Sequence, residues 1–158
     1  LFCQSEGRCQ NGTAKEVTTM ILTDTGPLVA LFDPKDPQHQ CCQAVLRTIK
    51  APLISTVPVL TEAFHILSPA SKGSQNLREF IRRGGLTIWF LNEETLQLAL
   101  ELMETYHDCP MDLADASLVV AAQSLKIQRI FTIDRKDFAV YRIRMGYHYK
   151  SFEVINCG

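Results

Sequence analysis

Four carboxylates at the edges of apolar segments are the residues of this sequence best suited to chemistry. Asp24 and Asp134 each follow a short β-type run. Glu62 and Asp115 each lie about one turn into a stretch whose apolar residues have helical spacing. Two unit charges about 4 Å apart repel by roughly 4 kcal/mol at an effective dielectric constant near 20. Four carboxylates gathered at one place would therefore stay ionised only if a cation neutralised them.

The types of neighbouring residues indicate which cation such a site would hold. Oxygen ligands without cysteine or histidine select Mg²⁺ or Mn²⁺ rather than zinc. Ions of this kind activate a water molecule and stabilise the leaving oxygen during phosphodiester cleavage. The nearby Ser, Cys and His residues form no nucleophile with a base and an orienting group. We therefore expect a metal-dependent hydrolase whose catalytic and metal-binding residues are Asp24, Glu62, Asp115 and Asp134.

Each acid also has a purely structural explanation. Asp24 is able to cap the helix that follows it. Asp112 is able to cap the helix expected at residues 113–125, with Asp115 in its first turn. Free N–H groups and the helix dipole favour negative charge at these positions. Glu62 alone fits a solvated helix residue, and Asp134 alone fits a turn residue or a partner of Arg135. The four acids together favour a site, because all are expected at one rim of a sheet.

Short β-type runs alternate with helical stretches along the chain. The β-type runs are expected at residues 21–24, 53–55, 86–91, 129–133 and 151–155. The helices are expected at residues 27–32, 38–50, 58–67, 74–83, from 93 past 103, and 113–125. This alternation predicts an α/β fold with a parallel sheet covered on both faces. In such sheets functional groups gather at the carboxyl ends of the strands.

Composition places the chain among ordinary globular proteins. With 158 residues, of which 46% are hydrophobic and 21% charged, we expect a single domain with one core. No apolar run is long enough to span a bilayer, so we expect no membrane association. The six cysteines show no metal-site spacing, and we expect reduced thiols in a cytoplasmic protein.

A formal net charge of −1 excludes a strongly basic surface but allows separate charged regions. Basic residues gather in the segment 126–150, and a solvated face explains this group as well as RNA binding does. The candidates for contact with an RNA backbone are Arg135, Lys136, Arg142 and Arg144.

The first nineteen residues differ from the rest of the chain. They are polar, show no periodicity and lack the apolar stretch of a signal peptide, and Met20 stands directly before the first β-type run. We expect residues 1–19 to be an unstructured or tag-like extension and residues 20–158 to form the functional domain.

Four short motifs resemble those of the PIN-domain family, and more narrowly the VapC-type toxin ribonucleases of bacterial toxin–antitoxin pairs. The motifs are TDTG at Thr23–Gly26, LTEAF at Leu60–Phe64, MDLADAS at Met111–Ser117 and TIDRKDF at Thr132–Phe138. The resemblance runs from about residue 20 to about residue 155. It implies a compact α/β/α sandwich around a short, mainly parallel sheet. It also implies a Mg²⁺- or Mn²⁺-dependent endoribonuclease that forms a homodimer and is inhibited by a cognate antitoxin protein.

The resemblance also assigns roles to single residues. It makes the acidic tetrad of the site Asp24, Glu62, Asp115 and Asp134. It makes Asp112 an auxiliary acid and either Thr25 or Thr132 a supporting hydroxyl. Asp137 is then a further auxiliary acid or a cap of the turn before Phe138. The extension at residues 1–19 departs from the family, whose members usually start just before the first strand.

Two other functions are compatible with parts of the sequence. A catalytically idle PIN-like module would bind RNA or a protein partner, but it would have no reason to keep mutually repelling carboxylates. A phosphatase or phosphoacceptor fold also places an aspartate after the first strand. Such a fold needs a second acid next to that aspartate, and Thr25-Gly26-Pro27 supplies none.

Overall fold

The computed structural model describes residues 20–157, in which seven strands and seven helices are assigned. The strands are β1 (Ile21–Thr23), β2 (Leu53–Thr56), β3 (Thr87–Trp89), β4 (Arg129–Phe131), β5 (Arg142–Met145), β6 (His148–Ser151) and β7 (Glu153–Ile155). The helices are α1 (Thr25–Phe32), α2 (His39–Thr48), α3 (Val57–Leu67), α4 (Lys72–Arg82), α5 (Glu93–Thr105), α6 (Leu113–Leu125) and α7 (Arg135–Val140). The predicted extension at residues 1–19 lies outside the described residues.

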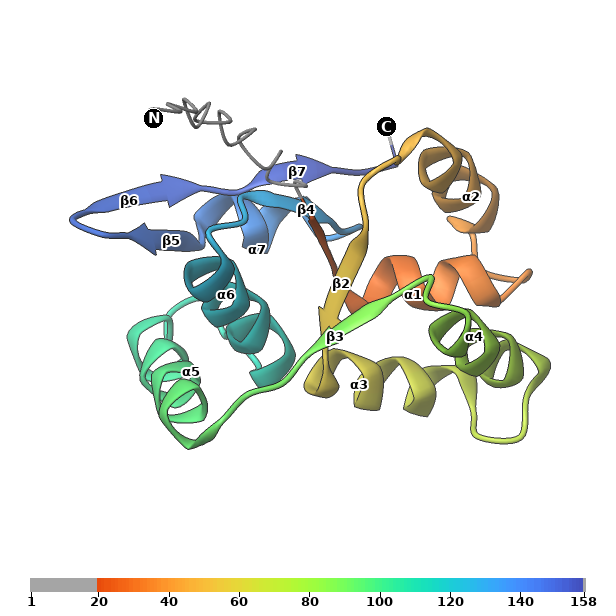
Figure 1. Cartoon of the computed structure of the whole chain (residues 1–158), viewed down its shortest axis with the longest axis horizontal. Helices are drawn as coiled ribbons and strands as arrows, with labels where there is room; N and C mark the ends of the chain where they lie inside the picture. The colour runs from red at the N-terminus through yellow and green to blue at the C-terminus, as the bar shows by residue number, and fades with distance from the viewer. Residues whose placement is uncertain (1–19, 158) are drawn as a thin grey trace, which may run out of the picture.

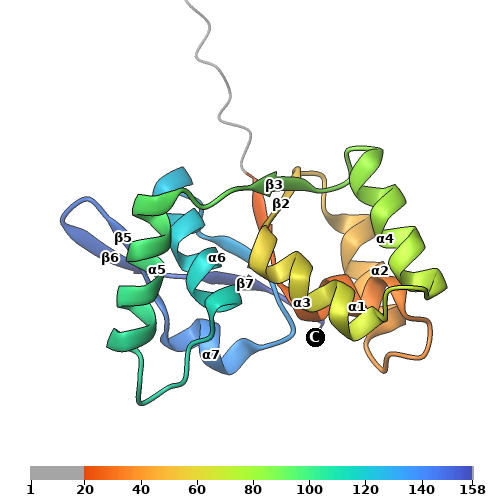
Figure 2. The same ribbon diagram turned by 90° about the horizontal axis from the view of Figure 1, so that it is seen from below.

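The centre of the fold is a five-stranded sheet in the order β3-β2-β1-β4-β7. All of its pairings are parallel, with Leu22 of β1 opposite Ile54 of β2 on one side and Ile130 of β4 on the other. Helices α1, α2 and α4 lie on one side of the sheet and α5 and α6 on the other (Figures 1 and 2). This arrangement confirms the predicted α/β/α sandwich around a mainly parallel sheet.

Helix α6 lies between the sheet and α5 and is buried on most of its sides. Its buried residues include Ala114, Ala116, Leu118 and every position of the run 119–122. A helix that is apolar on nearly all sides needs neighbours all round, which its composition predicts. Asp112 caps α6 by accepting a hydrogen bond from the backbone N–H of Asp115 at 2.8 Å, as expected from the sequence.

Two expectations from the sequence concern the cysteines and the absence of a membrane span. The four cysteines of the described residues are free thiols, as the sequence suggested. Among residues 20–157, no helix combines the length and the apolar character that a membrane crossing requires.

The predicted boundaries differ from the structure where capping decides them. Helix α1 begins at Thr25 rather than Pro27, because Asp24 caps the chain directly after β1. The strand predicted at residues 129–133 ends at Phe131, where the hydroxyl of Thr132 accepts a hydrogen bond from the backbone N–H of Asp134 and turns the chain.

The sequence predicts no element for the segment from residue 135 to residue 150. The structure forms α7 and the antiparallel hairpin β5–β6 there. Helix α7 has six residues, and the exposed hairpin buries Ile143 alone among its strand residues. Segments this short and this exposed carry too little hydrophobic periodicity to be recognised.

A buried pair of hydroxyls joins the sheet to α6. The Oγ1 atom of Thr56, at the end of β2, lies 2.6 Å from the Oγ atom of Ser117 on α6, and both side chains are fully buried. The hydroxyl of Ser117 donates to the carbonyl of Ala114 at 2.7 Å. The proton between the two hydroxyls therefore comes from Thr56, because Ser117 has only one proton to donate.

We expect Ser117→Ala to lower the free energy of unfolding by about 1–3 kcal/mol, because it leaves the buried hydroxyl of Thr56 without an acceptor. The double variant with Thr56→Val should recover most of this loss, since no polar atom then stays unpaired. Urea denaturation measures both values. Equal stability of the single and double variants would contradict the assigned hydrogen bond.

Candidate functional site

An open pocket of about 820 Å³ lies at the carboxyl ends of β1 and β4. Seven of the residues that line it are acidic: Asp24, Asp36, Glu62, Asp112, Asp115, Asp134 and Asp137. The four acids predicted as catalytic are all among them, although they come from four separate parts of the chain. Thr25, Arg135 and Lys136 also line the pocket. Asp36 is the one acid of the pocket that the sequence analysis did not single out, because no motif surrounds it.

Three of these acids cap helices whose first turns face the pocket. Asp24 accepts a hydrogen bond from the backbone N–H of Thr25 at 2.7 Å. Asp112 caps α6, and Asp134 accepts from the backbone N–H groups of Lys136 and Asp137 at 3.1 Å each. The capping expected from the sequence is therefore confirmed for Asp24 and Asp112, whereas Asp134, for which a turn or a pairing with Arg135 was the structural alternative, caps α7. Capping does not compete with a site, because the caps bring the starts of three helices, and their acids, to one pocket.

A buried threonine fixes the position of Asp24 relative to Asp134. The hydroxyl of Thr132, which is fully buried, donates to Oδ2 of Asp24 at 2.8 Å. The hydroxyl oxygen of Thr132 also accepts a hydrogen bond from the backbone N–H of Asp134 at 2.9 Å. Thr132 thus joins the acids that follow the neighbouring strands β1 and β4.

Hydroxyl groups also hold the other two acids. Thr25 Oγ1 donates to Oε2 of Glu62 at 3.3 Å, which links α1 to α3. The hydroxyl of Tyr141 donates to Oδ2 of Asp115 at 3.0 Å. The sequence predicted either Thr25 or Thr132 as a supporting hydroxyl. In the structure both threonines contact an acid of the pocket, Thr25 contacting Glu62 and Thr132 contacting Asp24.

Tyr141 is a site residue that the sequence analysis missed. Its ring is fully buried and packs edge-to-face against Tyr106 and Phe138. The residue stands outside the four motifs, in the segment to which no element was assigned. The only signal was a tyrosine in an apolar context, since a buried tyrosine usually finds a hydrogen-bond partner for its hydroxyl.

Burial and mutual repulsion raise the pKa values of the central acids. Burial raises the pKa of Asp24 to about 6, and the charges of Glu62 and Asp112 add to this while the hydrogen bonds from Thr132 and Thr25 oppose it. Burial, followed by the charges of Asp112 and Asp24, raises the pKa of Asp115 to about 7. Burial and Asp134 also raise the pKa of Asp137.

Among residues 20–157, no basic side chain offsets these charges by an ion pair. The ion pairs found in residues 20–157 are Arg83–Glu79 and His107–Asp108, and neither lines the pocket. The chemistry of the pocket therefore favours a positively charged ligand with an affinity for oxygen.

The donor atoms of the pocket suit a hard divalent cation. They are carboxylate and hydroxyl oxygens, which bind Mg²⁺ and Mn²⁺ in preference to softer metals. Within the described part of the chain, no three Asp, Glu, His or Cys side chains are already arranged to coordinate a metal ion. Mg²⁺ does not need such an arrangement, because it usually binds through one or two carboxylates and keeps several water molecules. The residues present therefore fit such an ion.

The basic residues predicted to contact RNA lie in two places. Arg135 and Lys136, in the first turn of α7, line the pocket and are exposed. Arg142 uses Nη1 to bind the carbonyls of Ala139, Val140 and Tyr141 at distances of 2.7–3.0 Å, so its guanidinium caps the end of α7. Arg144 lies farther along β5. The prediction for Arg142 overlooked this structural role, because α7 itself was not recognised.

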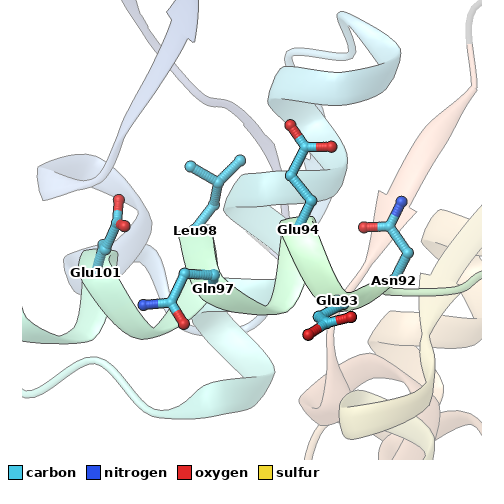
Figure 3. Close-up of a pocket in the computed structure, with 6 residues that line it drawn as sticks. All are labelled: Asn92, Glu93, Glu94, Gln97, Leu98 and Glu101. Carbon is cyan, nitrogen blue, oxygen red and sulfur yellow. The ribbon is translucent and has the colours of Figure 1, made fainter.

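A second depression of about 710 Å³ runs along α5, and its acids do not form a comparable site. Its lining includes Glu93, Glu94 and Glu101, which leave the single helix in different directions (Figure 3). Glu93 and Glu94 stand in the first turn of α5, where the helix dipole favours negative charge. No second element contributes a ligand, and a solvated helix face explains these residues.

The raised pKa of Asp115 predicts how the metal-free protein responds to pH. The folded state holds the proton of Asp115 more tightly than the unfolded state, so the free energy of unfolding should fall as pH rises from about 4 to about 7. Asp115→Asn should remove part of this fall and raise the stability at pH 8 by roughly 2 kcal/mol, allowing for partial exposure.

Urea denaturation in EDTA across this pH range measures the effect. Asparagine still accepts the hydrogen bond from Tyr141, and the exposed Asp108→Asn serves as a control that should change stability by less than about 0.5 kcal/mol. An unchanged pH profile in Asp115→Asn would show that the clustered charges do not destabilise the fold.

Comparisons with known proteins find relatives in sequence and in fold. The ribonuclease VapC26 of Mycobacterium tuberculosis is 24% identical over 125 residues, which cover 77% of this chain and 92% of the relative. Among solved structures, VapC20 of M. tuberculosis, described as a toxin that cleaves the sarcin–ricin loop, superposes with a TM-score of 0.68 at 15% identity, over 74% of this chain and 92% of that one. A toxin–antitoxin complex from Klebsiella pneumoniae gives a TM-score of 0.59 at 19% identity, over 76% and 91%.

The family itself follows from a match to the sequence model of the PIN domain. That match covers residues 21–143 and thus includes every predicted acid of the pocket. Because it spans well over half of the chain, the protein belongs to the PIN domain family.

Proposed function

We propose that this protein is a metal-dependent endoribonuclease and acts as the toxin of a type II toxin–antitoxin pair. The observation that carries the proposal is the gathering of Asp24, Glu62, Asp115 and Asp134 around one pocket. The names of the relatives support it, because one is a ribonuclease and two are toxins or toxin complexes. The antitoxin partner, the homodimer and the cytoplasmic location expected from the sequence belong to the same proposal.

The four central acids have distinct proposed tasks. Asp24 and Asp115, the acids with the clearly raised pKa values, would be the principal ligands of Mg²⁺ or Mn²⁺. Glu62 and Asp134 would position water molecules around the ion. When bound, the ion would make water a stronger nucleophile and stabilise charge on the phosphate oxygens.

The other side chains of the pocket would hold these acids and attract the substrate. Thr132 and Tyr141 each occupy one oxygen of a principal ligand, which fixes the orientation of that carboxylate. Arg135 and Lys136, exposed at the pocket, would offset the negative charge that the phosphate backbone brings towards the acids. Asp112 and Asp137 would add to the negative potential that retains the ion.

Cleavage of RNA tests the proposal directly. We expect the protein to cut single-stranded RNA in Mg²⁺ or Mn²⁺, and EDTA to abolish the cut. Asp24→Asn should lower the rate by at least about a hundredfold, since changes even to residues behind a metal ligand reach that size. Asp108→Asn, outside the pocket, should keep full activity.

Gel analysis of an end-labelled RNA follows these reactions. RNA binding without metal-dependent cleavage would instead support the catalytically idle module. Cleavage that persists in both EDTA and Asp24→Asn would reject the assigned site.

Tyr141→Phe tests the positioning of Asp115. The variant keeps the buried ring and removes the hydrogen bond that lowers the pKa of Asp115. We expect about a tenfold lower cleavage rate and an activity profile displaced to higher pH, because the carboxylate ionises later. A rate that falls equally at every pH, together with a lower melting temperature, would indicate a role in packing only.

A further inference from the structure

The hairpin β5–β6 is separate from the parallel sheet and projects past α5 and α6 at one end of the molecule (Figure 1). Gly146 and Tyr147 connect its strands. Gly146 has a φ of 65°, the left-handed value that the first position of a two-residue type II′ turn requires. This turn places Tyr147 at the tip of the hairpin, where the residue is fully exposed (101%).

The hairpin carries positive charge and has no acidic residue of its own, although Glu101 of α5 lines a small pocket together with Arg142 and Arg144. The stretch from residue 138 to residue 152 contains no aspartate or glutamate, and its cations are Arg142, Arg144 and Lys150. The ion pairs of the described residues lie elsewhere, so Arg144 and Lys150 are unpaired in that part of the chain. The charge of this surface is thus opposite to that of the acidic pocket.

Aromatic rings stand among these cations. Tyr149 lies directly opposite Arg144 in the strand register, so the two side chains share one face of the hairpin. Tyr149 is 68% exposed, and together with Tyr147 it accounts for all the large exposed apolar side chains of β5–β6. A protein partner would need an apolar core to its interface, and the two tyrosines with the neighbouring Leu98 of α5 make only a small one. Exposed rings next to unpaired cations fit single-stranded nucleic acid, whose bases stack and whose phosphates are anionic.

Helix α7 connects this surface to the pocket. Its first turn carries Arg135 and Lys136 at the pocket, and its six residues span about 9 Å before β5 begins. Arg142 fastens the base of the hairpin, because its side chain caps α7 and its backbone N–H donates to the hydroxyl of Tyr106 at 3.1 Å. The base of the hairpin is therefore joined to the pocket by one short helix, and the tip with Tyr147 lies the length of β5 farther along the chain.

We propose that hairpin β5–β6 is a docking arm for single-stranded RNA, in which bases stack on Tyr147 and Tyr149 and a phosphate contacts Arg144, whereas Lys150 lies opposite Ile143 on the other face of the hairpin. The choice of RNA rests on the proposed function. The requirement for a single strand follows from stacking, since paired bases are not free to leave their own stack. The arm lies mostly beyond residues 21–143, which match the PIN domain.

Binding measured without cleavage tests the arm. Fluorescence anisotropy in EDTA follows a dye-labelled oligouridine added to the full chain. Tyr147→Ala with Tyr149→Ala should weaken binding by about tenfold or more, whereas the two Tyr→Phe changes should keep the affinity. The control is Phe90→Ala, which removes a ring of similar exposure (70%) outside the hairpin and should leave binding unchanged.

Two further measurements separate stacking from general attraction. Replacing Arg144 by glutamine should reduce the slope of log K against log salt by roughly 0.7, the value for one phosphate contact on a single strand. The double Tyr→Ala variant should bind an RNA duplex as the unchanged protein does. Unchanged affinity of that variant for oligouridine, or an equal loss of affinity in Phe90→Ala, would refute the proposal that the hairpin binds single-stranded RNA.

The outcomes for the arm and for the nuclease are distinguishable. A protein that cuts RNA but binds it independently of the tyrosines would refute the arm alone. A protein that binds oligouridine through the tyrosines but shows no metal-dependent cleavage would refute the nuclease and keep the arm.

Discussion

The repulsion between carboxylates gathered in one partly buried pocket is the constraint on which the rest of this structure depends. Burial and neighbouring charge raise the pKa values of Asp24 to about 6 and of Asp115 to about 7. A fold selected for stability alone would separate such groups or pair them with basic residues. This one instead holds them together through Thr132 and Tyr141, whose hydroxyls each donate to one of the acids.

The architecture offsets part of this repulsion with backbone dipoles. Parallel strands end at the same edge of the sheet, and the chain turns from these ends directly into helices. Asp24 and Asp134 cap helices there, and Asp112 caps α6 beside them. Backbone N–H groups at the helix starts therefore stabilise the negative charge of these three acids. The carboxylate lone pairs that accept none of these hydrogen bonds remain available to a ligand in the pocket. Capping and ligand binding are two uses of one arrangement.

Charge is segregated over the molecule, which the net charge of −1 conceals. The pocket collects seven acidic residues, whereas the stretch from residue 138 to residue 152 has none. A polyanion would meet a repulsive pocket and an attractive hairpin, with Arg135 and Lys136 between them on α7. Under the proposed function, this separation would let the hairpin and α7 bind the RNA backbone while a metal ion makes the pocket accessible to one phosphate.

The sequence by itself determined the alternation of strands and helices, the burial of α6 and the identity of the four acids. Hydrophobic periodicity and residues at strand ends are local signals, so a single chain read in order reveals them. Tertiary structure alone decided that Thr132 contacts Asp24 across 108 positions and that Tyr141 contacts Asp115. It also decided that Arg142 caps α7 and that the hairpin exists. These contacts depend on the packing of distant segments, and short exposed elements carry little periodicity from which to foresee them.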